Sequence, residues 1–338
     1  MMRIKTTISC SGITYNSIDQ TINTTYTPKI GDVALFEVLE IGKHKTVQCD
    51  SKLNVTILPG DRILAAFGNR YATSQFEGYI PEQPTEILDI LGAGGAIGIV
   101  KSKNADFDDI DPTKLRLIGF AKNAENQIVN TVYNGIEKSE FRAEVPKNAK
   151  VLLSIGSTMD SGKTTTAAFL SRGIAMADKK VAFIKLTGTC YTKDKDLVYD
   201  CGAQMAIDFL DAGYPSTFML TKEELLDLYQ TLLDKLLAFN PDYIVMEIAD
   251  GILQRETEML LRDHHFMSTI HQVVLSCGDS LAAFYGISFL EEIGKKPIAI
   301  AGLFTKSPLL IEEVELRSKI PVLDLIKLAS PSIIRIFE

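Results

Sequence analysis

The pattern of apolar and polar positions changes once along the chain, near residue 147. Before that point, apolar residues form short runs rich in Val, Ile, Leu and Thr, and turn residues at Gly42, Asp50-Ser51 and Pro59-Gly60-Asp61 interrupt these runs. This pattern predicts short β-strands separated by tight turns. The expected strands lie within 31–41, 45–61, 62–68, 115–123 and 128–134, and the last two are expected to form a hairpin. Closely spaced short strands are typical of a small barrel or a sandwich.

After a polar connector at 143–150, apolar runs alternate with segments of helical periodicity. Residues 164–180 have helical spacing, and Thr221 and Glu224 have the spacing of a helix N-terminal capping box. The helix that Thr221 opens carries leucines 225, 228, 232 and 236 on one face and should end before Pro241. Strands are expected within 151–156, 180–186, 242–251, 269–279 and 297–305, with 320–325 as a candidate last strand.

Strands that alternate with helices predict a mostly parallel sheet covered on both faces. The sequence therefore predicts an α/β fold with a mostly parallel sheet for residues 148–338. A β-rich domain, either a barrel or a sandwich, is expected to precede it over residues 1–147. We interpret that first domain as an accessory, substrate-binding or docking module.

Composition and charge narrow the class of protein. The chain has 338 residues, 46% apolar and 23% charged, which is ordinary for a globular protein. No apolar run is long enough to cross a membrane, and the N-terminus has no apolar signal segment. The five scattered cysteines predict neither a zinc site nor disulfides, and they favour the cytoplasm. The net charge of −8 argues against a nucleic-acid partner.

The stretch GSTMDSGKTT, residues 156–165, follows an expected strand and opens an expected helix. The common phosphate-loop pattern, G-x-x-x-x-G-K-[ST], would place the first glycine at position 157, but here it is Gly156. A glycine-containing turn before a helix directs backbone N–H groups and the positive end of the helix dipole at phosphate oxygens. We expect Lys163 to contact the β- and γ-phosphates and Thr164 to offer its hydroxyl to Mg²⁺. The candidate nucleotide-contacting residues are Gly156, Ser157, Thr158, Met159, Asp160, Ser161, Gly162, Lys163, Thr164 and Thr165.

The spacing G-x5-G-K-T resembles the loop of dethiobiotin synthetase and its relatives, including the enzymes that form the amides of cobyrinic and cobyric acid. These are P-loop proteins of the SIMIBI group, which also contains the MinD-type and nitrogenase-iron-protein ATPases. The resemblance covers roughly residues 150–325, and the same half is similar to uncharacterised MobB-like P-loop proteins. It implies the fold of a P-loop NTPase, ATP and Mg²⁺ as cofactors, and a homodimer. The β-rich half has no counterpart in dethiobiotin synthetase.

The resemblance also implies functional residues outside the loop. A lysine on the second strand lies near the transferred phosphate in the family, and Lys185 in VAFIKLTGT matches it. A glutamate that ends the third core strand helps to hold Mg²⁺, and Glu247 in VMEIADG matches that position. Here Ile-Ala-Asp-Gly follows the glutamate in place of a glycine-rich run, so Asp250 is an additional carboxylate. For an aspartate that assists the metal, the candidates are Asp196 and Asp200, and Asp200 is preferred.

Several weaker signals have two interpretations. Thr305 and Lys306 follow a strand and are candidates for base or ribose contact, without the aspartate that guanine recognition needs. Asp160 either faces metal, water or nucleotide, or caps its own turn. Asp279 most simply caps a helix. The histidines at 264, 265 and 271 lack the spacing of a zinc site. The glycine-rich segment 92–98 suggests close backbone packing or a turn. The segment 67–73 suggests either a contact site or a hairpin loop.

Three functions compete at this stage. The first is phosphoryl transfer from ATP to a small molecule by a kinase or ligase-like enzyme, with Lys163 and Lys185 offsetting the γ-phosphate charge. Thr164, Glu247 and an aspartate would hold the metal, and residues 189, 191 and 193 (Thr, Tyr and Lys) would line the acceptor pocket. The second is an ATPase switch or adaptor whose nucleotide state controls a partner or dimer. The third, a nucleic-acid-handling NTPase, is disfavoured by the acidic charge and by the lack of an aromatic and basic cluster.

Overall fold

The computed structural model describes residues 3–337, and the chain divides into two compact units. Unit 1 contains the chain up to Glu137 together with two segments from later in the sequence, Gly188–Thr192 and Phe209–Met219. Unit 2 contains Lys138–Thr187, Lys193–Asp208 and the chain from Leu220 onward. The later half of the sequence therefore contributes to both units.

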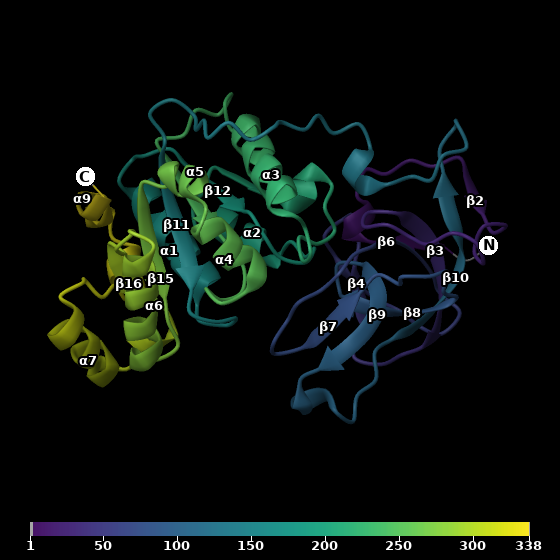
Figure 1. The fold of residues 1–338 in the computed structure, drawn as a ribbon, viewed down its shortest axis with the longest axis horizontal. Coiled ribbons are helices and arrows are strands. Elements are labelled where there is room, and N and C mark those ends of the chain that lie inside the picture. Colours follow the sequence, from purple (N-terminus) through teal and green to yellow (C-terminus); the bar gives the residue numbers. More distant parts are fainter. Residues whose placement is uncertain (1–2, 338) are drawn as a thin grey trace. The chain divides into compact units, whose positions relative to one another are not determined.

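Unit 1 is built mainly from short strands (Figure 1). These are β1 Ile4–Thr6, β2 Ser17–Asp19, β3 Val33–Glu40, β4 Thr46–Gln48, β5 Asn54–Thr56, β6 Arg62–Phe67, β7 Phe76–Tyr79, β8 Ile87–Gly92, β9 Ala96–Lys103 and β10 Lys114–Lys122. Short 3-10 helices lie at Ile8–Cys10 (η1), Ala105–Phe107 (η2) and Thr131–Tyr133 (η3).

The strand pairings of unit 1 close into a ring. β3 pairs with β6 and β10, β10 pairs with β8, β8 pairs with β9, and β9 pairs with β6. Alternate side chains of these strands fill the interior with large apolar groups, including Phe36, Phe67 and Phe120, all fully buried. The ring resolves the expectation of a barrel or a sandwich in favour of a small barrel, in which each of the strands β3, β6, β8, β9 and β10 has a partner on both sides.

The run 45–61 is divided at the expected turn Asp50-Ser51 into two strands, β4 and β5, which pair with each other. The second arm of the expected hairpin, 128–134, makes only isolated bridges, Lys122 with Ile128 and Asp32 with Asn130. It then turns into η3, because the side chain of Asn130 accepts a hydrogen bond from the backbone N–H of Val132.

Unit 2 contains the remaining strands and the longer helices. The strands are β11 Lys150–Gly156, β12 Val181–Lys185, β13 Met205–Asp208, β14 Tyr243–Glu247, β15 Gln272–Ser276 and β16 Ala299–Ala301. The helices are α1 Lys163–Met176, α2 Lys193–Asp200, α3 Lys222–Lys235, α4 Arg255–Leu261, α5 His264–Ser268, α6 Ser280–Glu292, α7 Pro308–Ser318, α8 Leu325–Leu328 and α9 Ile334–Phe337. Short 3-10 helices lie at Phe209–Ala212 (η4, in unit 1), Leu303–Lys306 (η5) and Pro331–Ile333 (η6).

The six strands of unit 2 form one parallel sheet in the order β13-β12-β14-β11-β15-β16. The chain moves from β11 to β12 on one side and later to β15 and β16 on the other. In such open sheets, ligands bind beyond the carboxyl ends of the strands near the place where the order reverses. That edge, at the end of β11, is where the loop 157–162 lies.

The helices follow from local sequence signals. Thr221 and Glu224 form the predicted capping box, and α3 ends at Lys235, before Pro241. The predicted leucine face of α3 is confirmed, since Leu225, Leu228, Leu232 and Leu236 are all buried. The connector before β11 lies along this helix: the backbone N–H of Ser139 donates to Thr231 Oγ1 at 3.0 Å, and that of Phe141 donates to Asp227 Oδ1 at 2.8 Å.

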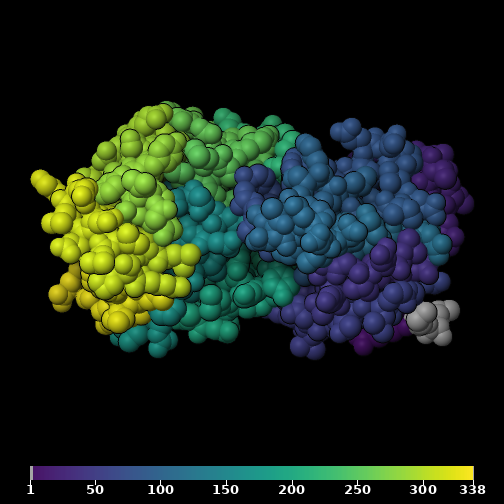
Figure 2. Space-filling view, turned by 90° about the horizontal axis from the view of Figure 1, so that it is seen from below, coloured from purple at the N-terminus to yellow at the C-terminus, as the bar shows by residue number. Residues whose placement is uncertain are grey.

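The candidate strand at 320–325 is wrong except for one bridge, between Ile300 and Val322. Pro321 has no N–H to donate to a sheet, and Asp324 instead caps α8 by accepting from the N–H of Lys327. Near this end of the chain α7 exposes Leu309 and Leu316. Figure 2 shows the C-terminal part of the chain as the surface coloured yellow. No helix in the described residues is both long and apolar enough to cross a membrane.

Candidate functional site

Close packing explains the positions of the two glycines in the loop between β11 and α1. A Cβ atom on Gly156 would lie 2.1 Å from Ser161 Oγ and 2.6 Å from Lys163 Cγ, so only glycine fits at that position. Gly162 precedes α1 with φ of 98°, in the left-handed region that glycine adopts at little cost. The first glycine therefore stands at 156, because the loop folds back over the end of β11 at that residue.

Contacts from neighbouring strands hold the loop in place. The N–H of Ser157 donates to the carbonyl of Ser276 at 2.9 Å, at the end of β15. The N–H of Leu303 donates to the carbonyl of Ser161 at 3.1 Å. A Cβ atom on Gly302 would lie 2.5 Å from that same carbonyl oxygen, so glycine is required for this approach. Asp160 has φ of 59°, a left-handed conformation that Asp tolerates better than most residues.

Lys163 is the first residue of α1 and is buried, with 6% of its surface exposed. Its ammonium donates to the carbonyl of Thr158 at 2.8 Å, so the lysine folds back across the loop. Burial lowers the pKa of Lys163, since an ammonium out of water is costly, and the nearby carboxylates only partly offset this. A bound phosphate would supply the missing counter-charge.

Thr164 and Glu247 meet beside the loop. The Thr164 hydroxyl donates to Glu247 Oε1 at 3.0 Å, and Glu247 is only 2% exposed at the end of β14. The second carboxylate oxygen, Oε2, is buried without a hydrogen-bond partner. Burial raises the pKa of Glu247. A hydroxyl and an incompletely satisfied carboxylate are ligands that suit Mg²⁺, which binds few protein groups and keeps several waters.

The sheet register brings opposite charges side by side at this edge. Lys185 ends β12 and pairs in register with Asp208 of β13 on one side and Glu247 of β14 on the other. Its ammonium contacts the Asp194 carboxylate and lies 3.9 Å from Glu247 Oε1. Burial would lower the pKa of Lys185, but the surrounding carboxylates outweigh it and raise that pKa. Lys185 is therefore held as an ammonium.

These groups share one cavity of about 330 Å³. The loop and the start of α1 line one side of it, and the ends of β12 and β14 with the start of α2 line the other. The lining residues are Met159, Asp160, Gly162, Lys163, Thr164, Thr165, Lys185, Asp194, Glu247, Ala249, Asp250 and Leu303. The structure thus brings together Lys163, Thr164, Lys185 and Glu247, which the sequence analysis singled out from separate segments.

Other predicted residues lie elsewhere. Asp200 is the exposed last residue of α2 and, like Asp196, is not part of the cavity lining. Thr305 and Lys306 belong to η5 and do not line the cavity, and the Thr305 hydroxyl donates to the carbonyl of Gly302 at 2.8 Å.

The residues expected to line an acceptor pocket also differ from the prediction. Thr189 and Tyr191 are part of unit 1, where Thr189 bridges to Ser216 and the Tyr191 hydroxyl bonds the Asn54 amide. Lys193 begins α2 and is exposed. Asp194, which the sequence analysis did not single out, contacts Lys185 in their place. It lies within an acidic and basic run, KDKD, and nothing in that run marks which carboxylate turns inward.

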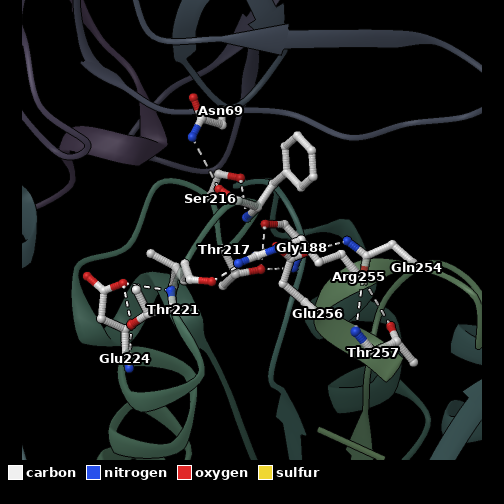
Figure 3. A network of polar contacts seen from close by, with 12 residues as sticks. Asn69, Gly188, Ser216, Thr217, Thr221, Glu224, Gln254, Arg255, Glu256 and Thr257 are labelled. Carbon is white, nitrogen blue, oxygen red and sulfur yellow. Dashed lines mark hydrogen bonds and ion pairs between the residues drawn. The ribbon is translucent and has the colours of Figure 1, made fainter. Parts of the chain in front are cut away.

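The weaker signals have structural explanations. Asp279 caps α6 as predicted, accepting from the N–H of Ala282 at 2.8 Å. The close packing expected in 92–98 is confirmed, since a Cβ atom on Gly94 would lie 1.8 Å from the carbonyl oxygen of Cys190. In the segment 67–73, Asn69 makes a hydrogen bond within unit 1: its side-chain amide donates to the carbonyl of Phe218 at 3.3 Å (Figure 3).

The histidines show no metal arrangement. Among residues 3–337, no group of three or more His, Cys, Asp or Glu side chains is arranged to hold a metal ion. His264 and His265 are exposed on α5, and His271 lies 3.0 Å from the carbonyl oxygen of Phe337.

Comparison with known proteins adds little beyond the fold. No family model matches the sequence, and no curated protein matches it. Among solved structures, a nucleotide-binding protein from Archaeoglobus fulgidus in complex with ADP is 14% identical, with a TM-score of 0.35, over 56% of this chain and 88% of that one.

Two further solved structures are similar at the same level. A DUF1611 family protein from Anabaena variabilis is 14% identical, with a TM-score of 0.40, over 60% of this chain and 62% of that one. A ParA family ATPase from Chlorobium tepidum is also 14% identical, with a TM-score of 0.34, over 56% and 93%. Scores this low establish neither a shared family nor a shared activity.

The class of fold therefore follows from the loop, from the start of α1 and from the sheet order in unit 2. A parallel sheet whose first strand leads through a glycine-framed loop into a helix that begins Lys-Thr has the features of a P-loop nucleotide-binding fold.

Proposed function

We propose that this chain is a Mg²⁺- and ATP-dependent phosphotransferase that acts on a small molecule, with a phosphate loop like that of dethiobiotin-synthetase-like proteins but another substrate. The observation that carries the proposal is the shared cavity: the phosphate loop and Lys185 face the same space of about 330 Å³. A pure nucleotide switch does not need a second reactant beside the γ-phosphate, whereas a transferase does. The cavity adjoins Lys185, as the transferase interpretation requires.

The nucleotide side of the proposal rests on the loop. Backbone N–H groups at the start of α1 and the Lys163 ammonium would bind the phosphates. Thr164 and Glu247 would hold Mg²⁺, and Asp194 rather than Asp200 would be the assisting aspartate, since it lines the cavity. When bound, Mg²⁺ would neutralise charge on the phosphates. Lys185 would stabilise the γ-phosphoryl group during transfer, because its ammonium is buried and already oriented by Asp194.

The first test measures nucleotide binding. Lys163→Ala should abolish the rise in melting temperature that ATP and Mg²⁺ give the wild type, which at a hundredfold excess over Kd corresponds to about 2.7 kcal/mol. Lys235→Ala, which removes an exposed lysine from the end of α3, is the matched control and should keep the full shift. An unchanged shift in Lys163→Ala would show that the loop does not bind the nucleotide.

The second test measures transfer. A metabolite screen for ADP release should identify compounds that stimulate the intact protein and fail to stimulate Lys185→Ala. Running the screen with ATP and with GTP in parallel decides the preferred base. If Lys185→Ala responds to every compound as the wild type does, Lys185 has no part in transfer.

A second candidate function is an ATPase switch or adaptor that acts through a partner or a homodimer. One observation favours it: β12 and β13, which end at Lys185 and Asp208, run directly into segments 188–192 and 209–219 of unit 1. A change at these strand ends on nucleotide exchange would therefore be transmitted along the chain into the barrel. Light scattering with ADP and with a non-hydrolysable ATP analogue tests this function, which predicts a nucleotide-dependent change in mass or partner binding.

A further inference from the structure

Building on the proposed phosphotransferase function, we propose that the acceptor is an alcohol without a carboxylate beside its reacting hydroxyl, and that Asp250 accepts the hydroxyl proton. The inference rests on three features of the cavity: its balance of charges, the partners of its two ammonium groups, and the loop that presents Asp250.

Carboxylates outnumber ammonium groups in the cavity lining by four to two. The acidic residues are Asp160, Asp194, Glu247 and Asp250, and the basic ones are Lys163 and Lys185. The cavity is also more than an acidic patch on the surface, since Glu247 Oε2 is buried inside it without a hydrogen-bond partner. An orphaned buried oxygen of this kind calls for a ligand to complete it.

Neither ammonium group is available for an acceptor carboxylate. Lys185 is 9% exposed and already contacts Asp194, with Glu247 at 3.9 Å. Lys163 stands at the start of α1, where the phosphates would bind. ATP adds further negative charge even with Mg²⁺ bound, so a carboxylate substrate would meet repulsion without a compensating cation. A hydroxyl group enters without that penalty.

The loop that carries Asp250 is fixed on both sides. The N–H of Ala249 donates to Thr187 Oγ1 at 2.8 Å, and the Ala249 carbonyl accepts from Thr257 Oγ1 at 3.0 Å. The N–H of Ile252 donates to the carbonyl of Gly156 at 2.9 Å. Between these anchors Asp250 has φ of 64°, in the left-handed region.

Two further contacts strengthen this arrangement. A Cβ atom on Gly251 would lie 2.5 Å from the carbonyl oxygen of Ser157, so the Asp250 loop packs directly against the phosphate loop. The cap of α4 holds the far end, where the Gln254 side chain accepts from the N–H of Thr257 at 3.0 Å (Figure 3). The backbone that presents Asp250 to the cavity is therefore held in place before the acceptor binds, and general base catalysis needs a base that is positioned in this way.

In the proposed step, the acceptor oxygen forms a bond to the γ-phosphorus of ATP. The bond from that phosphorus to the β,γ-bridging oxygen breaks, and its electron pair leaves on ADP. The hydroxyl proton moves to the Asp250 carboxylate. The products are a phosphate monoester and ADP, and Asp250 later releases the proton to water.

Product chemistry tests the acceptor class. The protein is incubated with Mg²⁺, ATP and either a panel of polyols and amino alcohols or the matched panel of carboxylic acids, with hydroxylamine present. An acyl phosphate is trapped by hydroxylamine as a hydroxamate, whereas a phosphate monoester is not. We expect alcohols alone to stimulate ADP release, with phosphate monoesters visible by ³¹P NMR. Hydroxamate formation from the carboxylic acids would overturn the inference.

Water serves as a hydroxyl probe for Asp250 that needs no knowledge of the acceptor. Asp250→Asn should lower ATP hydrolysis about 10²- to 10⁴-fold while leaving the ATP-dependent melting shift in place. The matched control is Asp178→Asn, since Asp178 also has positive φ, 57°, but is exposed and lies outside the cavity lining. Asparagine tolerates this backbone conformation, so both variants should fold.

The outcomes separate the two proposals. A wild-type protein that shows no melting shift with ATP and Mg²⁺ refutes the proposed function itself. A melting shift together with unaltered hydrolysis in Asp250→Asn refutes only the inference about Asp250. A wild type that binds ATP yet transfers to neither water nor any alcohol also counts against the inference.

Discussion

Glu247 combines three properties at the residue scale: deep burial, a hydrogen bond from Thr164 and an oxygen without a partner. Burial of such a carboxylate lowers the stability of the protein without a ligand, and a bound cation would offset this cost. The same reasoning applies to Lys163, whose pKa is lowered by burial until an anion arrives. The two residues are complementary to a metal and a phosphate.

Glu247→Gln therefore separates metal use from nucleotide binding. The amide keeps the shape of the side chain and removes the charge that would face Mg²⁺. We expect Mg²⁺-dependent turnover to fall at least about tenfold, with a much smaller change in the ATP-dependent melting shift. Titration of turnover against Mg²⁺ concentration provides the measurement. Equal losses of turnover and of nucleotide binding would contradict a metal role.

His44 provides a pH-dependent test in the barrel. It is buried, packs edge-on against Phe76, and burial lowers its pKa to about 3 from 6.5. The unfolded chain takes up the proton below pH 6.5 while the folded one does not, so this histidine makes stability fall as pH falls. The loss between pH 7 and pH 5 should be about 2 kcal/mol.

Denaturant unfolding at these two pH values measures the effect. His44→Gln cannot take up the proton, so its free energy of unfolding should depend less on pH than that of the wild type. His265→Gln, which alters an exposed histidine on α5, should keep the wild-type slope. The same slope in His44→Gln and the wild type would mean that His44 titrates equally in both states.

At the element scale, helix ends were the most predictable feature. The Thr221 side chain accepts from the N–H of Glu224 at 3.2 Å, and Glu224 Oε2 accepts from the N–H of Thr221 at 2.8 Å. These bonds are local in sequence, so four residues were enough to identify them. The prediction of a strand at 128–134 was wrong because a strand depends on residues far away in the sequence. It forms only where a neighbouring strand pairs with it along its whole length, and this segment makes only isolated bridges.

The capping box gives a stability prediction for α3. Thr221→Ala should cost about 1 kcal/mol in the free energy of unfolding, because the backbone N–H of Glu224 loses the hydroxyl that accepts its hydrogen bond. Thr221→Ser keeps the hydroxyl and should restore most of it. Urea unfolding of the three proteins is the measurement, and a Thr221→Ala protein as stable as the wild type would show that the cap does not limit stability.

At the scale of the whole molecule, the chain is interleaved. Segments 188–192 and 209–219 come from the later half but belong to unit 1. There the Gln48 amide bonds Thr192 twice, donating to its hydroxyl at 2.9 Å and accepting from its N–H at 3.0 Å. The two segments are also joined to each other, since the N–H of Thr217 donates to the carbonyl of Gly188 at 3.0 Å (Figure 3).

Removal of the first part of the chain should therefore damage the rest. A fragment of residues 138–338 retains the phosphate loop but leaves segments 188–192 and 209–219 without the barrel residues that bind them. We expect it to unfold at a lower urea concentration than the full chain, and to regain stability when a separate 1–137 fragment is added. A fragment with the same unfolding midpoint as the full chain would show that these segments need no barrel.

The sequence by itself determined what depends on local spacing. The phosphate loop, the helix caps and the alternation of strands with helices follow from residues a few positions apart, and so their places were predictable. The barrel closure was not, because it depends on a pairing between β6 and β9 that no short pattern records.

Only the tertiary structure decided which charged groups meet. Lys185, Asp194 and Glu247 converge because the register of β12 with β14 and the start of α2 bring them to one edge. Asp200 lies only six positions after Asp194 and is still outside the cavity lining, because six residues of α-helix are about 1.7 turns and place it on another face of α2. The sequence determines which side chains carry a charge, but packing in the tertiary structure determines which charged groups lie next to each other.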